Sequence, residues 1–513
     1  MHPSVHARTD PDRIAYRIVP SGEVVTYGEL DARSNQAAHL FRSLGLRRGD
    51  VVAILLENHA RYYELAWAAD RSGLYYTCLS TQLSATDVGR ILADCGASIL
   101  LTSRRMQPLA EQVRASAPAV RCYLVDGSAD GFEDYLAARD GFPTVPVADE
   151  SCGSSMLYSS GTTGRPKGVE VSLPEGPLDQ VDQLTRIAVD HFGYEPGMVY
   201  LVPAPLYHSA PLRWSMLVHK VGGTVVVMPK FDALGALECI ERYGITVSQW
   251  VPTHFVRMLK LPEADRKRFD LSTQKVVFHA AAPCPVEVKR RMMAWWGPIL
   301  REFYAGTEFN GMTAITAEEW LAHPGSVGRP VFGELHICDD KGEPLPAGEE
   351  GLVYFGGGVR FRYRNDPQTT AAAYNAAGWS TLGDIGRVDA DGYLYLTDRK
   401  GFLVISGGVN IYPREIEDVV VGHPDVADVA VIGAPDEDLG ERLVAVVELL
   451  PGRERTPTLV DEIQAMVERD LGRLKVPRQV DVVDRLPRHA TGKLYKRLLR
   501  DSYRESHEAG AHT

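Results

Sequence analysis

The chain has 513 residues, and its 55 Lys and Arg against 67 Asp and Glu leave a formal net charge of −12. A single hydrophobic core stops growing near ~250–300 residues, so this length predicts at least two domains. Apolar residues make up 45% and charged residues 24% of the chain, values that exclude a disordered or fibrous protein. The acidic balance, without a basic tract, argues against nucleic acid or an anionic membrane as a partner.

Seven cysteines lie far apart, and no pair has the C-x-x-C spacing of a redox or zinc motif. This usage is typical of a reducing cytosol rather than of a disulfide scaffold. The N-terminal stretch MHPSVHARTDPDRIAY lacks the apolar run of a secretory signal. The longest apolar runs, such as VVAILL at 51–56, fall far short of the ~18–20 residues of a membrane span. We therefore expect a cytoplasmic protein without a membrane span.

Strand-like and helix-like segments alternate over most of the chain. We predict strands at Val51–Leu56 and Ala97–Leu101, with helices at Asn58–Ala69 and Ala85–Asp94. Further short strands are predicted at Val199–Pro203, Gly223–Met228 and Lys275–Ala280. The stretch KRRMMAWW at 289–296 predicts a packed helix with one basic face. This alternation favours an α/β fold of layered, largely parallel sheets.

The pattern changes after about residue 325, where glycine-rich turns separate short alternating runs. We expect a small antiparallel, β-barrel-like unit there, with a hairpin turn at Asp391-Gly392. From Tyr412, a helix-like stretch and two β-like runs predict a compact C-terminal unit. We place the main boundary near 398–401, so that residues 1–398 form the large domain, 399–401 a hinge and 402–513 the small domain.

The segment YSSGTTGRPKG at 158–168 concentrates hydroxyls, glycines and one lysine. Glycines let backbone N–H groups turn toward a ligand, hydroxyls donate to oxygens, and Lys167 adds a point charge. The spacing is not that of a Walker A loop. The preceding run ends at Met156–Leu157, so we expect the loop to leave a strand, where ligand loops sit in α/β folds. The segment therefore predicts a phosphate-binding loop.

YSSGTTGRPKG resembles the phosphate-binding signature of the adenylate-forming superfamily, which contains acyl- and aryl-CoA ligases, luciferases and the adenylation domains of peptide synthetases. Six further segments resemble the family's other motifs in the family's order: PLYHSAP at 205–211, FYAGTE at 303–308, GSVGRP at 325–330, GWSTLGDIG at 378–386, LTDRKGFLVISGGVNIYPREIE at 396–417 and LPRHATGKLYKR at 486–497. The resemblance implies a large N-terminal adenylation domain and a small, mobile α+β C-terminal lid.

The resemblance also implies roles for individual residues. Glu308 is the Mg²⁺ ligand, in keeping with the preference of Mg²⁺ for oxygen, and Thr307 is a phosphate contact. Tyr304 stacks on adenine, and Asp384 accepts from both ribose hydroxyls. The full set of implied nucleotide and cofactor contacts is Ser159, Ser160, Gly161, Thr162, Thr163, Gly164, Lys167, Ala281, Ala282, Pro283, Tyr304, Ala305, Gly306, Thr307, Asp384, Arg399, Gly407 and Gly408.

Four residues are implied to be catalytic: Lys493, His208, Glu308 and Thr163. Lys493 would lie between the attacking carboxylate and the α-phosphate, where a preorganised cation is typically worth about 3–4 kcal/mol. From the residues alone, Lys493 is also compatible with a solvated base in a basic C-terminal stretch. In the same way, His208 is also compatible with a partly buried histidine whose hydrogen bonds are satisfied.

A second half-reaction at the same site requires the lid to move, because the acyl-adenylate must first be shielded from water and then offered to a thiol. The family's hinge position corresponds to Gly401, where aspartate or lysine is usual. Glycine loosens the backbone, so the balance between lid states is expected to differ. Ser406, Gly407 and Gly408 suit a loop that lets a pantetheine arm pass, although a plain turn is the alternative.

The acid pocket departs from the common pattern at Ala280-Ala281-Ala282-Pro283, where many relatives have Gly-Gly-Ala-Pro, and at Tyr304-Ala305-Gly306. The added methyl groups narrow or reshape the wall. Four apolar residues are candidates for the acid pocket: Trp214, Trp250, Phe309 and Met312. We identify no cation there for an amino-acid or dicarboxylate substrate.

These observations predict an AMP-forming acyl-CoA synthetase that uses ATP, Mg²⁺ and coenzyme A on a fatty, steroid side-chain or arylalkanoic acid. One alternative loads a carrier-protein phosphopantetheine instead of CoA. Two others are a luciferase-type oxidative enzyme and a nucleotide-binding regulator without turnover. Glu308 and Lys493 argue against the regulator, since binding alone needs neither. The sequence does not fix the oligomeric state, and a homodimer stays open.

Overall fold

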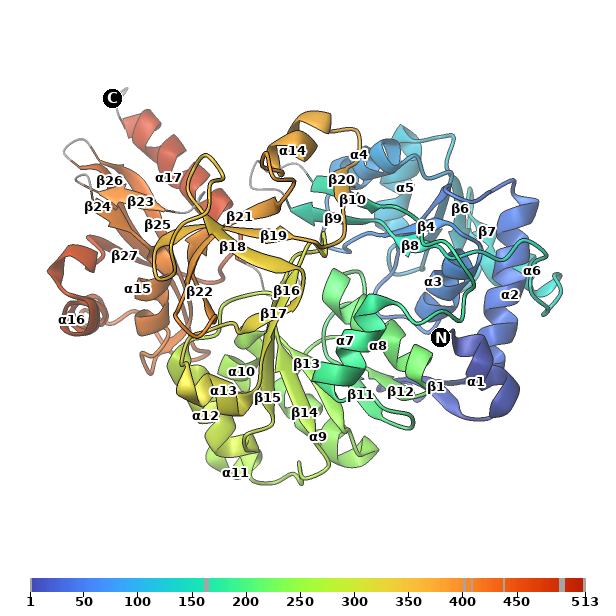
Figure 1. Ribbon diagram of the computed structural model, residues 1–513, viewed down its shortest axis with the longest axis horizontal. Helices are drawn as coiled ribbons and strands as arrows, with labels where there is room; N and C mark the ends of the chain where they lie inside the picture. The colour runs from blue at the N-terminus through green and yellow to red at the C-terminus, as the bar shows by residue number, and fades with distance from the viewer. Residues whose placement is uncertain are drawn as a thin grey trace.

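A computed structural model describes residues 2–160, 166–399, 403–406, 409–436, 439–488 and 494–510. Two large sheets with helices around them form the N-terminal part, and a smaller unit near the C-terminus lies beside the end of the second sheet (Figure 1). Within the described residues, no helix is both long and apolar enough to span a bilayer.

The first large sheet is parallel throughout, in the order β7-β6-β5-β3-β4-β8. Its strands are β3 (Val51–Leu55), β4 (Tyr75–Cys78), β5 (Ile99–Thr102), β6 (Arg121–Leu124), β7 (Glu133–Asp134) and β8 (Ser154–Ser155). Five helices belong to this part: α2 (Tyr27–Ser43), α3 (Tyr62–Arg71), α4 (Ala85–Cys95), α5 (Gln107–Ser116) and α6 (Tyr135–Asp140). Every residue of β3 is buried, as expected for an apolar strand covered on both faces.

The second sheet has nine strands in the order β17-β16-β15-β14-β13-β11-β12-β1-β2, parallel in the middle and antiparallel at both ends. Its strands are β1 (Ile14–Ile18), β2 (Val24–Thr26), β11 (Val199–Val202), β12 (Thr224–Val227), β13 (Val247–Trp250), β14 (Val276–His279), β15 (Leu300–Ala305), β16 (Met312–Ile315) and β17 (Arg329–Phe332). The accompanying helices are α1 (Pro3–Thr9), α7 (Gln183–Phe192), α8 (Ser209–Val221), α9 (Ala233–Tyr243), α10 (Pro252–Leu259), α11 (Glu263–Arg266), α12 (Val286–Trp296) and α13 (Ala317–Ala322).

The phosphate-loop motif lies on a separate antiparallel sheet of three strands, β20-β10-β9. These are β9 (Leu157–Ser160), β10 (Pro166–Val171) and β20 (Phe361–Tyr363), with α14 (Pro367–Ala372) after β20. The loop therefore follows a strand, as predicted, but that strand extends to Ser160 and pairs antiparallel with β10. The two described ends of the motif lie on paired antiparallel strands rather than at the end of a parallel strand, since Lys167 and Ser159 are direct partners.

The predicted antiparallel unit after residue 325 contains a four-stranded sheet in the order β18-β19-β21-β22. Its strands are β18 (Glu334–Cys338), β19 (Glu350–Gly356), β21 (Ser380–Val388) and β22 (Leu394–Arg399). The predicted hairpin turn at Asp391-Gly392 joins β21 to β22, and Gly392 has the positive φ of 84° that this turn needs.

The C-terminal unit has its own sheet, in which β27 adds a parallel strand to β24-β23-β26-β25. Its elements are β23 (Val404–Ser406), β24 (Val409–Ile411), α15 (Pro413–Val420), β25 (Val426–Asp436), β26 (Gly440–Leu449), α16 (Leu459–Leu471), a 3₁₀ turn (Arg473–Lys475), β27 (Gln479–Val483) and α17 (Lys496–Gly510). The chain changes sheet between Arg399 and Val404, and residues 400–402 lie outside the described part. The domain boundary near 398–401 stays a prediction.

One local prediction was wrong, and a second holds only in part. The helix expected from Asn58 begins at Tyr62, because the Asn58 side chain is bound elsewhere: it donates to the backbone oxygens of Ala204 (3.1 Å) and Met228 (2.7 Å). The helix at 289–296 is packed with Arg290 and Arg291 exposed, as expected, but Lys289 is not part of this basic face. It is fully buried, with its Nζ 2.6 Å from Glu302 Oε2.

Candidate active site

A cavity of about 590 Å³ lies between the second large sheet, the four-stranded sheet and the C-terminal unit. Its walls come from the start of α8, the ends of β13, β14 and β15, and the loop that follows β15. The C-terminal unit contributes charged residues from α15 and from the segments on either side of residues 489–493, among them Arg414, Glu417, Asp418, Arg488 and Lys496. Most of the described residues that were predicted to form the site lie around this one cavity.

The predicted adenine and ribose contacts are brought together across two sheets. The hydroxyl of Tyr304, on β15, donates to Asp384 Oδ2, on β21, over 2.7 Å. Ala305 and Gly306 continue the same cavity wall. Arg399 is the last residue of β22, and its backbone pairs with Asp384. An aromatic face and a carboxylate therefore lie side by side, an arrangement suited to a nucleoside.

The loop after β14 forms another wall through Ala281, Ala282 and Pro283. Ala281 has a φ of 74°, in the left-handed region that favours glycine. This is one of the positions where many relatives have glycine. The alanine side chain thus narrows the cavity at the expense of backbone strain, which is common at ligand sites.

Glu308 is buried and faces the cavity, beside Thr307. The hydroxyl of Tyr363, on β20, donates to Glu308 Oε1 over 3.0 Å, and the Lys167 Nζ lies 5.2 Å from the centre of the Tyr363 ring. Tyr363 therefore joins the predicted metal ligand to the predicted phosphate lysine. A buried carboxylate beside a cation and a hydroxyl is suited to a divalent cation that also contacts phosphate.

His208 is the N-cap residue of α8 and is 9% exposed, with its ring facing the cavity beside Tyr207. The predicted catalytic residues Lys493 and Thr163 lie outside the described residues, as do Gly161, Thr162, Gly164, Gly407 and Gly408. Arg488 and Leu494, which bracket the segment that contains Lys493, both line the cavity. Ser159 and Ser160 are the last residues of β9.

All four predicted acid-pocket residues line the cavity: Trp214, Trp250, Phe309 and Met312. Trp214 packs against Phe303 with ring centres 5.1 Å apart, and Phe309 stacks on Phe332 at 4.9 Å. The Trp250 indole N–H donates to Ser248 Oγ over 2.7 Å, so its ring presents apolar surface with its polar atom satisfied. This part of the cavity suits an apolar or aromatic group.

Three of the cavity residues that sequence reasoning missed lie close to the predicted contacts. Tyr363 lies on a strand that no motif marked, Glu302 precedes the FYAGTE motif, and Arg213 lies in the middle of α8. The expectation that the acid pocket holds no cation stays a prediction; Arg213 is a cation that lines the cavity beside Thr307. Arg213 lies two residues after the PLYHSAP motif, and this proximity in sequence could have indicated that it belongs to the site.

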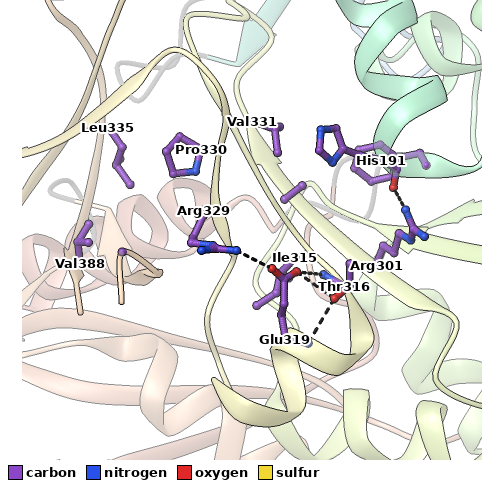
Figure 2. A pocket seen from close by; sticks show the side chains of 13 residues that line it. His191, Arg301, Ile315, Thr316, Glu319, Arg329, Pro330, Val331, Leu335 and Val388 are labelled. Atoms are coloured by element: carbon purple, nitrogen blue, oxygen red, sulfur yellow. Dashed lines mark hydrogen bonds and ion pairs between the residues drawn. The ribbon is translucent and has the colours of Figure 1, made fainter. Parts of the chain in front are cut away.

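A second hollow, of about 580 Å³, lies on another part of the large sheet, between α7, α13 and β17. Figure 2 shows its charged residues turned toward partners: Glu319 toward Arg329 and Thr316, and Arg301 toward the backbone of His191. Glu319 lies 3.1 Å from the Arg329 guanidinium. Its thirteen lining residues include none of the predicted site residues. The first cavity is therefore the candidate active site.

Comparisons with known proteins agree with this geometry. The model of the AMP-binding enzyme family matches residues 4–362, and the model of its C-terminal domain matches residues 415–493. The chain belongs to the AMP-binding enzyme family. At the level of this family it is an ATP-dependent, AMP-forming acid–thiol ligase, which confirms the resemblance to the adenylate-forming superfamily.

Members of the family with curated functions align over nearly the whole chain. The chain is 34% identical to a feruloyl-CoA synthase of an Amycolatopsis species over 97% of both proteins. It is 32% identical to the fatty acid–[acyl-carrier-protein] ligase ScoC of Streptomyces coeruleorubidus, over 98% of this chain and 95% of ScoC. It is 31% identical to the long-chain-fatty-acid–CoA ligase FadD13 of Mycobacterium tuberculosis, over 97% of both.

Solved structures of the family share the fold. ATP-bound MatB from Rhodopseudomonas palustris superposes with a TM-score of 0.82 at 29% identity, covering 98% of this chain and 99% of MatB. The anthranilate CoA ligase AuaEII in complex with anthranoyl-AMP superposes with a TM-score of 0.84 at 25% identity, covering 99% of this chain and 98% of AuaEII. The α/β fold with a large N-terminal and a small C-terminal part is therefore that of adenylate-forming enzymes.

Proposed function

We propose that this enzyme joins an apolar carboxylic acid (a fatty, steroid side-chain or arylalkanoic acid) to a thiol in two steps at the one cavity. In the first step, a carboxylate oxygen attacks the α-phosphorus of ATP, the bond to the β-phosphate breaks, and pyrophosphate leaves. In the second step, the thiol sulfur attacks the acyl carbon, the acyl bond to AMP breaks, and the thiol proton is released. The main support for this proposal is the contact between Tyr304 and Asp384, because it places an aromatic ring and a carboxylate suited to a nucleoside beside an apolar pocket.

In the first step, Tyr304 would stack on adenine and Asp384 would accept from the ribose hydroxyls. The segment Ser159–Gly164, with Lys167 and Thr307, would hold the phosphates, and His208 would border the acid's carboxylate. Lys493 would place its charge between carboxylate and α-phosphate, where negative charge grows. Because both reactants are anions, these local cations and N–H donors must offset the chain's net charge of −12.

Glu308 suits the Mg²⁺ that nucleoside triphosphates carry. It is a buried carboxylate facing the cavity, and the Tyr363 hydroxyl fixes one of its oxygens. Mg²⁺ is commonly held by one or two protein carboxylates together with phosphate oxygens and water. When bound, the metal would neutralise phosphate charge, and Tyr363 would orient Glu308, its protein ligand.

For the second step, we propose that residues 402–513 act as a lid that turns about a hinge at 399–401 relative to residues 1–398. Gly407 and Gly408 would then lie on the path of the pantetheine arm. The charged residues that α15 already presents to the cavity support a lid that shares the site. Burial raises the pKa of Asp418 and thus disfavours its charged form, while Arg414, 3.9 Å away, acts in the opposite direction.

The thiol is either that of coenzyme A or that of a carrier-protein phosphopantetheine. CoA is the first choice, given the CoA ligases among the relatives, whereas the alignment with ScoC favours a carrier protein. We place the enzyme in the cytoplasm, where ATP and CoA are available. We leave a homodimer open and propose neither nucleic acid nor a membrane as a partner.

The test is release of AMP and pyrophosphate from ATP and Mg²⁺ over a panel of fatty, aromatic and steroid acids, with CoA and a phosphopantetheinylated carrier protein offered in separate reactions. We expect AMP in step with a thioester for at least one acid. Formation of AMP with the carrier protein alone would select the second acceptor. If no acid gives AMP with either thiol, the ligase function is wrong.

A further inference from the structure

Arg213 of α8 lies in the wall of the candidate active site, and its hydrogen-bond partners among the described residues are not carboxylates. Its Nε donates to Ser155 Oγ over 3.1 Å, and its Nη1 donates to the backbone oxygen of Thr307 over 2.8 Å. Among the described residues, no carboxylate lies within ion-pair distance of its guanidinium. A guanidinium has five N–H donors, so these two bonds leave donors available on the side of the cavity.

Two buried arginines of this chain, Arg71 and Arg139, have structural roles. Arg71 lies 2.9 Å from Asp31 and 2.7 Å from Glu150, and Arg139 lies 2.6 Å from Glu64. A charge taken out of water is costly unless it is paired, and these two arginines have acidic partners within the protein. Arg213 differs from both, since its partners are a hydroxyl and a carbonyl oxygen.

Arg213 is nonetheless a cation in a poorly solvated place. Burial lowers the pKa of its guanidinium, while Tyr76 and Glu308 act in the opposite direction. An arginine in proteins keeps its charge at neutral pH. A cavity that holds such a charge beside Trp214 and Phe309 is therefore complementary to an apolar molecule that carries an anionic group.

We propose that Arg213 is a specificity-determining residue that binds a second carboxylate on the acid substrate. This inference rests on the proposed ligase function and narrows its apolar acid to one with a carboxylate at each end of an apolar body. His208, which would border the reacting carboxylate, lies at the start of α8, and Arg213 is five residues further along the helix. At 1.5 Å per residue, their backbones are about 7–8 Å apart along the axis. The second carboxylate would therefore meet Arg213 beside the Thr307 backbone, at a position separate from His208.

The test compares matched acids in the same enzyme preparation: adipic with hexanoic acid, and 3-(4-carboxyphenyl)propanoic with 3-phenylpropanoic acid. The ratio of kcat/KM for diacid and monoacid does not depend on how much of a variant is folded. We expect the wild type to favour the diacid in at least one pair by about 10-fold or more. Arg213→Met should reverse that preference, and Arg213→Lys should give an intermediate ratio.

Arg257→Met is the control, because Arg257 is an exposed residue of α10 and should leave the ratio unchanged. A wild type that favours the monoacid in both pairs overturns the inference. An Arg213→Met variant in which kcat/KM falls equally for all four acids also overturns the inference, since Arg213 would then only support the Thr307 loop. If the wild type forms no AMP with any acid, the proposed function fails and this inference fails with it. AMP formation with an unchanged ratio overturns the inference alone.

Discussion

The Tyr304 hydroxyl donates to Asp384 Oδ2 over 2.7 Å, although the two residues are 80 positions apart in the chain. The bond joins the large sheet, through β15, to the four-stranded sheet, through β21. It therefore orients an aromatic ring and a carboxylate relative to one another before any nucleotide binds. Preorganisation of this kind lowers the ordering cost of binding.

Replacing Tyr304 with Phe should weaken ATP binding while leaving the stacking face in place. Because the hydrogen bond to a charged group is lost, we expect the KM for ATP to rise roughly 3- to 10-fold, with a smaller change in kcat. Steady-state kinetics at saturating acid and thiol would measure it. Tyr243→Phe, far from the cavity lining, is the matched control. An unchanged KM for ATP would remove the role given to this pair.

Tyr363 makes a comparable contact with Glu308, over 3.0 Å. Groups that orient a metal ligand commonly change metal affinity by 10- to 100-fold when they are removed. We therefore expect Tyr363→Phe to raise the Mg²⁺ concentration for half-maximal AMP formation by about 10-fold. A Mg²⁺ titration would show it. Tyr374→Phe should not have this effect, because the Tyr374 hydroxyl donates to the backbone of Phe361 instead. Equal Mg²⁺ dependence in both variants would contradict the assignment of Glu308.

Ala281 holds a left-handed backbone conformation, with φ at 74°. For a residue with a Cβ this conformation costs about 1–2 kcal/mol, part of which glycine recovers despite its larger freedom in the unfolded chain. Ala281→Gly should therefore raise the free energy of unfolding by about 0.5–1 kcal/mol, as measured by urea denaturation. Ala282→Gly, without a positive φ, should lower it. The strain account fails if Ala281→Gly is the less stable of the two.

Two buried histidines link stability to pH. Burial lowers the pKa of His219 and of His254 to about 3 in the folded state, against about 6.5 when unfolded. Below pH 6.5 the unfolded chain takes up protons that the folded chain does not, so both histidines reduce stability as pH falls from about 6.5 toward 3. Asp70, whose pKa burial raises to about 6, acts in the opposite direction between about pH 6 and 4.

A variant isolates one histidine from these opposing effects. Between pH 7 and pH 5, His254→Gln should lose about 2 kcal/mol less unfolding free energy than the wild type, since one titrating group is absent. Urea denaturation at the two pH values measures the difference. A loss equal to that of the wild type would mean that His254 is accessible to protons in the folded protein.

Much of the fold could be predicted because its causes are local. Continuous apolar runs such as Val51–Leu55 predict buried parallel strands, and Asp391-Gly392 predicts a hairpin. The helix start at Tyr62 could not be predicted, because Asn58 binds backbone groups about 150 residues away. The burial of Lys289 could not be predicted for the same reason. Its partner, Glu302, is 13 residues away on the next strand, and no spacing rule for a helix reveals such a pair.

The candidate site also contains residues that the sequence could reveal and residues that it could not. Tyr304, Glu308 and Asp384 could be named because each stands in a family motif, and all three line the cavity, while their roles stay predictions. Arg213 was missed because its contacts, Ser155 and Thr307, lie 58 and 94 residues away. A single arginine in a helix is usually solvated, and its burial is a product of tertiary packing.

The central claim is that the acid becomes an acyl-adenylate, and one isotope measurement tests it directly. An accepted acid labelled with ¹⁸O at both carboxylate oxygens is turned over with ATP and the thiol, and the released AMP is analysed by mass spectrometry. Because a carboxylate oxygen attacks the α-phosphorus and stays with AMP when the thiol displaces it, each AMP should carry one ¹⁸O. Unlabelled AMP, or label in inorganic phosphate instead, would contradict the account.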